Sequence, residues 1–259
     1  MTAFARRHDR VMVGALAVLC VVAFWELSGR NGWVNPLFTS YPSQVLREGI
    51  ELMSSPRFPE HARASFLEFA YGFVLGILVG LPLGLILGRF RRLNLIFEPL
   101  IMALYVTPRL ALLPIIIVWL GIGLYSKVAV VFLGAVFPIL INVLTGIKLV
   151  DPLWLRAARS YGASELDLFT KVMLPGSLPY IFLGVRLGLG RALLGVIVAE
   201  MYVSTVGIGH LIMQAGEIMR TGRLMFLAIL VSLLGTALTL GLRSVEGHVI
   251  RWGRASDRG

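Results

Sequence analysis

The chain has 259 residues, of which 57% are hydrophobic and only 15% are charged, and its formal net charge is +10. Because soluble domains carry about 25% charged residues, this composition excludes an ordinary soluble domain and indicates an integral membrane protein. The positive charge does not indicate a nucleic-acid-binding protein, since the basic residues are scattered among apolar segments, as expected of charges that orient membrane helices.

The first apolar segment covers residues 11–27 and follows a short basic stretch. A signal peptide begins in the same way, but the small residues here form no convincing cleavage site, so we expect an uncleaved membrane span. Cys20 is the only cysteine of the sequence, which excludes an intrachain disulfide. Residues 28–65 are more polar, and we expect them either to contact a protein on the outer side or to lie on the membrane surface.

Three more segments are long enough to cross the bilayer as helices, at residues 66–88, 95–120 and 126–148. The middle one contains Pro108 and Pro114, so we expect it to be kinked or to end early and re-enter the membrane.

Glycine recurs every four residues in the segment 66–88, which predicts one nearly smooth stripe along a helix. The fifth span repeats this device less strictly. Such stripes allow a neighbouring backbone to approach closely, so these glycines predict a tightly packed bundle and no chemistry. They are Gly72, Gly76, Gly80, Gly84 and Gly88 in the first stripe, and Gly184, Gly188 and Gly195 in the second.

A polar insert at residues 151–178 separates two apolar segments. Asp151 is a good N-cap residue and Pro152 suits the first position of a helix, so a short helix should begin here. Gly162 is where this helix should stop. Its predicted apolar face consists of Leu153, Ala157 and Tyr161.

A second short helix is predicted to begin at Ser164, because Asp167 three residues later completes a weak capping-box pattern. We expect Pro175 and Pro179 to end it and to redirect the chain into the next span. Its predicted apolar face consists of Leu166, Phe169 and Val172 or Met173. The insert is therefore predicted to form two short amphipathic helices at the membrane surface.

The last two spans are predicted at residues 179–203 and 224–243. Ionisable residues inside a membrane are costly, so they are functional candidates. The candidates for a pathway or a buried pair are Arg109, Arg191 and Glu200. The alternative for Glu200 is a side chain that reaches the outer surface, and for Arg186, also in the fifth span, one that reaches the inner surface.

The distribution of basic residues gives the orientation. With a cytoplasmic N-terminus, fourteen Lys and Arg residues fall in inner segments and seven in outer ones, Lys127 among the latter. This excess favours a multi-pass protein of the plasma (inner) membrane with both termini in the cytoplasm. It also places the polar insert in the cytoplasm.

The sequence shows no GxxxxGK[ST] phosphate-binding loop, no HExxH metal motif and no GxSxG nucleophile elbow. We therefore predict no enzymatic activity, no cofactor and no metal site for this chain. The insert either docks in a groove of a separate motor protein and passes its motion to the spans, or packs as a solvated loop on the membrane. Pattern alone leaves both possibilities open.

The stretch "RAARSYGASELDLFTKVMLPGSLPYI" (residues 156–181) resembles the EAA loop of ABC-importer permeases. Its pattern is Glu-Ala-Ala, three residues, Gly, and then a hydrophobic-x-Leu-Pro. Ala157, Ala158, Gly162, Leu174 and Pro175 fall on this pattern, and Arg156 stands where the family usually has Glu. The resemblance implies that these residues, together with Arg159, form coupling helices that sit in a cleft of the ATP-binding subunit.

Most of the chain, from about residue 34 to 245, is similar to the sulfonate, nitrate and taurine branch of these permeases. The similarity is carried by "NPLFTSYPSQV", by "TPRLALLPIIIVWLGIGLYSKVAVVFLGAVFPILINVLTGIKLVDP" and by "GVRLGLGRALLGVIVAEM". It implies a homodimer, two copies of an ABC ATP-binding subunit, an outer solute-binding protein and a small anionic substrate. ATP closes the ATPase pair in this family, the coupling helices follow, and the bundle opens outward.

We accordingly predict an all-α polytopic bundle of about six transmembrane helices, embedded in the lipid bilayer, with a cytoplasmic coupling loop. Residues 1–65 hold the first helix and the outer segment, 66–245 the permease core with the coupling loop 151–178, and 246–259 a basic tail. A self-sufficient channel or secondary transporter is the alternative, but such proteins usually show inverted repeats or broken helices with ion-coordinating groups. A membrane-embedded enzyme should show a cluster of catalytic residues.

Overall fold

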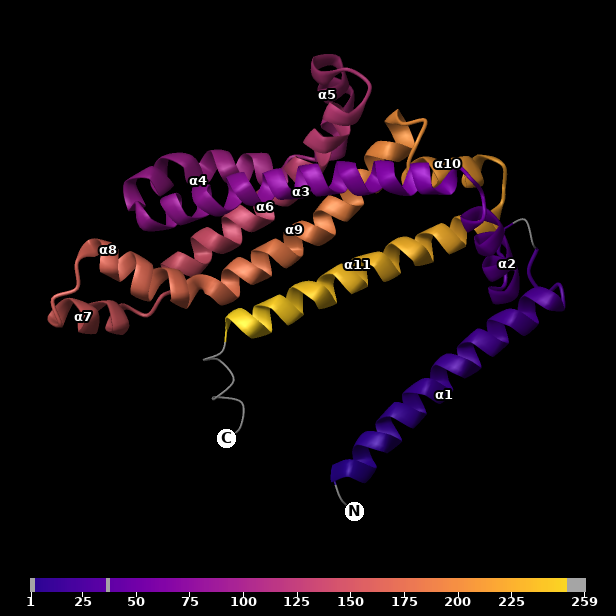
Figure 1. Cartoon of the computed structure of the whole chain (residues 1–259), viewed down its shortest axis with the longest axis horizontal. Coiled ribbons are helices and arrows are strands. Elements are labelled where there is room, and N and C mark those ends of the chain that lie inside the picture. The colour runs from indigo at the N-terminus through magenta and orange to yellow at the C-terminus, as the bar shows by residue number, and fades with distance from the viewer. Residues whose placement is uncertain (1–2, 36–37, 251–259) are drawn as a thin grey trace. The chain divides into compact units, whose positions relative to one another are not determined.

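The computed structural model describes residues 3–35 and 38–250, and side chains from residue 12 onward (Figure 1). These described residues form helices and no strand, which confirms the predicted all-α class. In chain order the helices are α1 (Ala3–Arg30), α2 (Pro42–Met53), α3 (Phe58–Arg89), α4 (Arg91–Val106), the 3₁₀ turn η1 (Arg109–Leu112), α5 (Leu113–Leu120), α6 (Leu124–Lys148), α7 (Pro152–Ser160), α8 (Glu165–Asp167), the π turn η2 (Leu168–Met173), α9 (Leu174–Val203), α10 (Ile208–Glu217) and α11 (Thr221–Val249).

The predicted number of spans is confirmed among the described residues. Five helices are long and apolar enough to cross a membrane, and a bent pair makes a sixth. The five helices are Met12–Arg30, Phe58–Arg89, Leu124–Lys148, Glu165–Val203 and Thr221–Val249. α3 already begins at Phe58, so the break before the second span is shorter than the sequence suggested.

The bent pair is the span in which a kink was expected. α4 and the segment Arg109–Leu120 meet at an angle of 85°. Thr107 has an extended backbone (φ −58°, ψ 128°), since the ring of Pro108 disfavours helical geometry in the residue before it. Pro114 lies in the first turn of α5, where its missing N–H is not needed. The span is therefore broken rather than curved.

The described residues fall into two compact units. The first comprises residues up to His61 together with Leu211–Val231, and the second comprises Ala62–His210 with the rest of α11. Within the first unit, Trp25 of α1 donates a hydrogen bond to the carbonyl of Ser40 (2.7 Å), and Glu26 accepts one from the Ser43 amide (2.9 Å). These contacts fix the start of α2 against α1.

The second unit is built around α6, which is the most buried of the candidate spans. The glycine stripe of α3 packs on one side of it: a Cβ at Gly84 would lie only 2.7 Å from Cβ of Val143. The glycines of α9 also pack on α6: a Cβ at Gly188 would lie 3.1 Å from the carbonyl oxygen of Ala135. Both predicted glycine stripes are thus packing surfaces, and both serve the same helix.

The polar insert begins as predicted. Asp151 caps α7 by accepting a hydrogen bond from the Leu153 amide (2.8 Å). Gly162 has a positive φ of 79°, which favours glycine, and it ends the helix. Ser164 and Asp167 form a complete capping box, with the Asp167 amide donating to the Ser164 hydroxyl (3.1 Å).

The prediction that Pro175 and Pro179 end the second helix is wrong. α8, η2 and α9 run without interruption from Glu165 to Val203. The reason is the π turn directly before Pro175, in which the Leu174 amide donates to the carbonyl of Phe169, five residues back. A proline would clash with the carbonyl four residues earlier in a regular helix, and the wider turn relieves this clash. The insert therefore contains one separate short helix, followed by the beginning of a long one.

Candidate functional site

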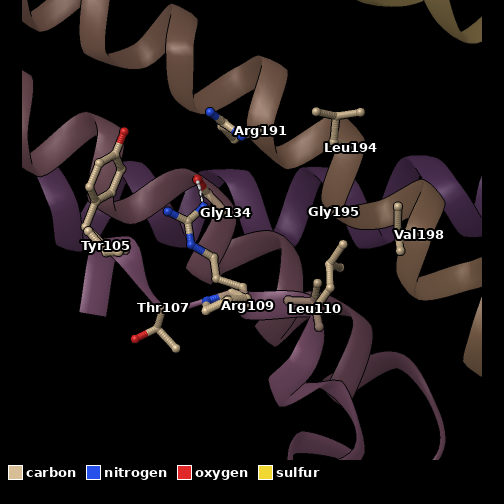
Figure 2. Close-up of a pocket in the computed structure, with 12 residues that line it drawn as sticks. Tyr105, Thr107, Arg109, Leu110, Gly134, Arg191, Leu194, Gly195 and Val198 are labelled. Atoms are coloured by element: carbon tan, nitrogen blue, oxygen red, sulfur yellow. Dashed lines mark hydrogen bonds between the residues drawn. The ribbon is translucent and has the colours of Figure 1, made fainter. Parts of the chain in front are cut away.

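A cavity of about 500 Å³ opens in the second unit at the break between α4 and α5. Residues 105–110 form one wall, α6 contributes Val130 and Gly134, and α9 contributes Leu194, Gly195 and Val198 (Figure 2). The break that Pro108 introduces therefore exposes a stretch of irregular backbone to a cavity. Non-helical backbone at membrane depth is tolerated where it lines a cavity.

The Arg109 side chain is fixed in this cavity by a hydrogen bond and two cation–π contacts. Its Nη1 donates a hydrogen bond to the carbonyl oxygen of Gly134 (3.3 Å), which lacks its usual helical partner because the residue four positions on is Pro138, without an N–H. Its guanidinium carbon lies 5.7 Å from the ring centre of Tyr105 and 5.6 Å from that of Phe137, within cation–π range. Its Nε is buried and has no hydrogen-bond partner among the described residues.

Arg191 of α9 lines the same cavity, so the structure brings two of the three candidate residues together. Figure 2 shows both arginine side chains toward the same end, with Leu194 and Val198 toward the other. The two positive charges are close enough to interact unfavourably. Among the described side chains, neither arginine forms an ion pair with a carboxylate.

Two positively charged guanidinium groups thus lie in a largely apolar cavity without a counter-charge from the described chain. Placing such charges in a membrane is costly unless an anion compensates them. The cavity is therefore suited to a small anion whose oxygens accept hydrogen bonds from guanidinium and whose remainder contacts Leu194, Val198 and Val130.

Glu200, the third candidate, does not line this cavity. Its side chain is fully buried (0% exposed), so it does not reach the outer surface. It accepts hydrogen bonds from the Ser65 hydroxyl (2.6 Å) and the Gly209 amide (2.7 Å). Arg186 forms an ion pair with Glu246 of α11 instead of extending freely to the inner surface.

The coupling-loop residues lie together at one end of α9 (Figure 1). The apolar face predicted for the first helix is exposed: Leu153 is 58% and Tyr161 93% exposed, and Ala157 is exposed as well. Leu166 is also exposed, whereas Leu168 is buried. This loop therefore presents apolar side chains that are more than half exposed in the described chain, among them Leu153, Tyr161 and Leu166.

The loop is tied to the bundle through Glu165. Its carboxylate pairs with Arg159 of α7 (3.1 Å) and with Arg89 at the end of α3. Ala158, Leu174 and Pro175 are half-buried, and Arg156 is exposed beside Ala157. Of the seven predicted loop residues, four are thus exposed, namely Arg156, Ala157, Arg159 and Gly162.

Sequence reasoning missed the residues that hold Arg109 and those that accompany Glu200. Lys127 was assigned to an outer segment, yet it is only 7% exposed and forms an ion pair with Glu68, which is 2% exposed. Glu68 is the only acidic residue in the predicted span 66–88, so its position within an apolar span was the available signal. Tyr105 and Phe137 carried no signal, because aromatic residues are common in apolar helices.

Residues 75–251 match the family described as "Binding-protein-dependent transport system inner membrane component". The putative aliphatic sulfonates transport permease protein SsuC of Bacillus subtilis is 33% identical over 95% of this chain and 90% of its own. The taurine transport system permease protein TauC of Escherichia coli is 31% identical over 95% and 90%. The nitrate import permease protein NrtB of Leptolyngbya laminosa is 28% identical over 91% and 86%.

Among solved structures, the fold is similar to an inward-facing conformation of the MetNI methionine ABC transporter. The TM-score is 0.61, and the match covers 72% of this chain and 93% of the other at 20% sequence identity. This likeness supports the all-α fold.

Proposed function

Since this chain belongs to the family of binding-protein-dependent transport system inner membrane components, we propose that it is the permease subunit of an ATP-driven ABC importer for a small anionic solute. The inference that the substrate is an anion rests on the cavity with Arg109 and Arg191. This cavity holds two positive charges and no carboxylate from the described chain. The names of its relatives, which move sulfonates, taurine or nitrate, agree with this charge.

The exposed apolar side chains of α7 support a second part of the proposal, a dock for an ATP-binding subunit. Leu153, Trp154 and Tyr161 are each more than half exposed. A partner's groove would remove this apolar surface from water, which is favourable by roughly 25 cal/mol per Å². Hydrolysis of ATP would then take place in the partner, and this chain would not be an enzyme.

The assembly that we propose contains two copies of this chain, two copies of the ATP-binding subunit and an outer solute-binding protein. Both termini of the chain lie in the cytoplasm, so that the coupling loop faces the ATPase. Closure of the ATPase pair on ATP moves the two coupling loops, and the bundle opens outward to receive the solute. In this proposal residues 1–65 hold the first transmembrane helix and the outer segment. Residues 66–245 form the permease core, and residues 246–259 form a basic tail.

Substitution of Gly162 tests the dock. Aspartate at this position is strained by the φ of 79°, and it adds a charge beside the apolar face. We expect Gly162→Asp to lose most of the ATP-binding subunit when the tagged permease is purified in mild detergent and its partners are identified by mass spectrometry. Gly121→Asp is the matched control, because Gly121 also has a positive φ (77°) and, like Gly162, open space around its Cβ position.

Equal recovery of the ATP-binding subunit with both variants would contradict the dock at α7. If no ATPase co-purifies with the unmodified chain, the self-sufficient channel becomes the better hypothesis, and flux through the chain alone in lipid vesicles would decide it.

A further inference from the structure

A buried polar cluster lies at the opposite end of α9 from the coupling loop, outside the cavity. Its three charged members come from three helices: Glu68 from α3, Lys127 from α6 and Glu200 from α9. They are 2%, 7% and 0% exposed, respectively. Buried charges of this kind are retained only when they are paired and hydrogen-bonded, so the groups around them are informative.

The Glu200 carboxylate binds the chain segment that follows α9. It accepts a hydrogen bond from the Gly209 amide (2.7 Å) and one from the Ser65 hydroxyl (2.6 Å). The Ser65 oxygen in turn accepts a hydrogen bond from the Ile208 amide (2.8 Å). Two successive backbone N–H groups, those of Ile208 and Gly209, are thus held by α3 and α9.

Lys127 holds the other end of the same segment. Its ammonium group pairs with Glu68 and donates a hydrogen bond to the Ser204 hydroxyl (2.9 Å). The Ser204 oxygen accepts a hydrogen bond from the Val206 amide (3.2 Å), which closes a tight turn. Residues 204–209 are therefore fixed at both ends by side chains from three different helices.

The approach of this segment to Glu200 requires glycine. Gly207 has a φ of 132°, which L-residues with a side chain rarely adopt, and a Cβ there would lie 2.6 Å from Oε2 of Glu200. Aligning the N–H groups with the carboxylate leaves no room for any other residue at this position.

The cluster lies on two of the helices that form the cavity, α6 and α9, a few residues beyond the cavity itself. Glu200 lies two residues beyond the cavity residue Val198 on α9, and Lys127 lies three residues before the cavity residue Val130 on α6. The segment 204–209 connects their ends, because it follows α9 and accepts a hydrogen bond from α6. The segment therefore links the two helices that form these cavity walls.

We propose that residues 204–209 form a latch, held by Glu200, Ser65 and the Lys127–Glu68 pair, that keeps the outer ends of α3, α6 and α9 together and that must release for the cavity to open outward. This proposal rests on the proposed topology, in which both termini lie in the cytoplasm and these helix ends therefore lie on the outer side. Glu200 and Ser65 are positioning residues in this proposal, since they act through the segment and do not touch the cavity.

Thiol labelling tests the latch in membranes that contain the assembled transporter. In a Cys20→Ser background the sequence has no other cysteine, so Ile208→Cys, at a side chain that is 6% exposed, reports directly on the segment. Val198→Cys reports on the cavity wall. We expect a membrane-impermeant maleimide to label both slowly. Ser65→Ala should speed the labelling of both about tenfold, equivalent to about 1.4 kcal/mol, because it removes the two hydrogen bonds that the Ser65 hydroxyl makes.

Three further variants separate the latch from a general loss of structure. Ser65→Thr keeps the hydroxyl and should restore slow labelling. Gly207→Ala should release the segment while every charged residue is retained, because its Cβ would clash with the Glu200 side chain. Gly190→Ala, on α9 at a position with no atom within 4 Å, should leave labelling unchanged. Unchanged labelling in Ser65→Ala and Gly207→Ala, or equally fast labelling in Ser65→Thr, would overturn the proposal.

Thr205→Cys distinguishes a failed latch from a failed topology, because the Thr205 side chain is exposed in the same segment. Fast labelling of this cysteine in intact cells agrees with the outer location. If it is labelled only in inverted membranes, the proposed orientation fails, and the latch is then judged from the other variants in those membranes.

Discussion

At the scale of single residues, the two arginines of the cavity were identifiable from the sequence because a charge inside an apolar span is rare. What surrounds them was not. The carbonyl of Gly134 and the rings of Tyr105 and Phe137 come from helices whose packing determines the contact. The sequence alone does not show which of these residues are in contact, so the environment of Arg109 is known only from the structure.

Arg109→Ala is expected to lower uptake of the anionic solute strongly, by roughly tenfold or more, because it removes one of the two charges that attract the anion and a hydrogen-bond donor. Assembly with the ATP-binding subunit should remain, since Arg109 lies far along the chain from the coupling loop. Uptake of labelled solute into cells, normalised to membrane-inserted protein, measures the effect. Arg57→Ala, an exposed arginine outside the cavity, is the control, and equal uptake by the two variants would refute the role of Arg109.

At the scale of elements, proline was the least reliable signal. Pro108 breaks its helix as predicted, because Thr107 is free to adopt an extended backbone at the cavity. Pro175 does not, because the preceding turn widens into a π turn that tolerates its ring. Local sequence rules assume a regular helix before the proline, and the packing that selects a π turn instead is a property of the folded bundle. The caps at Asp151 and Ser164 were predictable because their partners lie within three residues.

Pro175→Ala tests the use of this π turn. Alanine permits a regular helix, so residues 168–173 can lose the extra residue of the turn, and α7 and α8 then rotate by about 100° around the axis of α9. We expect the variant to fold with an unchanged thermal midpoint in detergent, while uptake and solute-stimulated ATP hydrolysis fall about tenfold, equivalent to roughly 1.4 kcal/mol of docking free energy. Pro179→Ala, one turn later, should behave like the unmodified chain; if both variants are fully active, the π turn has no role in coupling.

At the scale of the whole molecule, composition and the apolar segments predicted the class and the number of spans, and the periodicity of glycine predicted tight helix packing, because these depend on the bilayer and on backbone contact rather than on individual partners. The family came from the resemblance of residues 156–181 to the EAA loop. The division into two units was not predictable. Leu211–Val231 joins the N-terminal residues across a long separation in the sequence, and no local pattern marks such a contact.

If the bent pair α4–α5 crosses as one span, the chain crosses six times and both termini lie on the same side of the membrane. The excess of basic residues in the inner segments then predicts that this side is the cytoplasm. Fusions of a fluorescent reporter that matures only in the cytoplasm should be bright at either end, and fusions of a phosphatase that is active only outside should be inactive at either end. A bright reporter at one end and an active phosphatase at the other would mean that the bent pair α4–α5 does not cross.

The glycine contacts of α3 and α9 with α6 have a mechanical consequence. Each glycine leaves room for the Cβ or the backbone of an α6 residue. Along α3 these contacts repeat every four residues, or about 6 Å along the helix axis. Sliding by less than a full step would drive Val143 and its neighbours into the helix backbone, so the helices cannot slide past one another between Gly72 and Gly88 of α3 and between Gly184 and Gly195 of α9. The outer ends beyond these glycines, which the segment 204–209 joins, are not locked in this way. Motion during transport must then take place where these glycine contacts are missing. The break at Thr107–Pro108 is such a place, which makes the wall of the cavity and the hinge of the molecule the same short piece of chain.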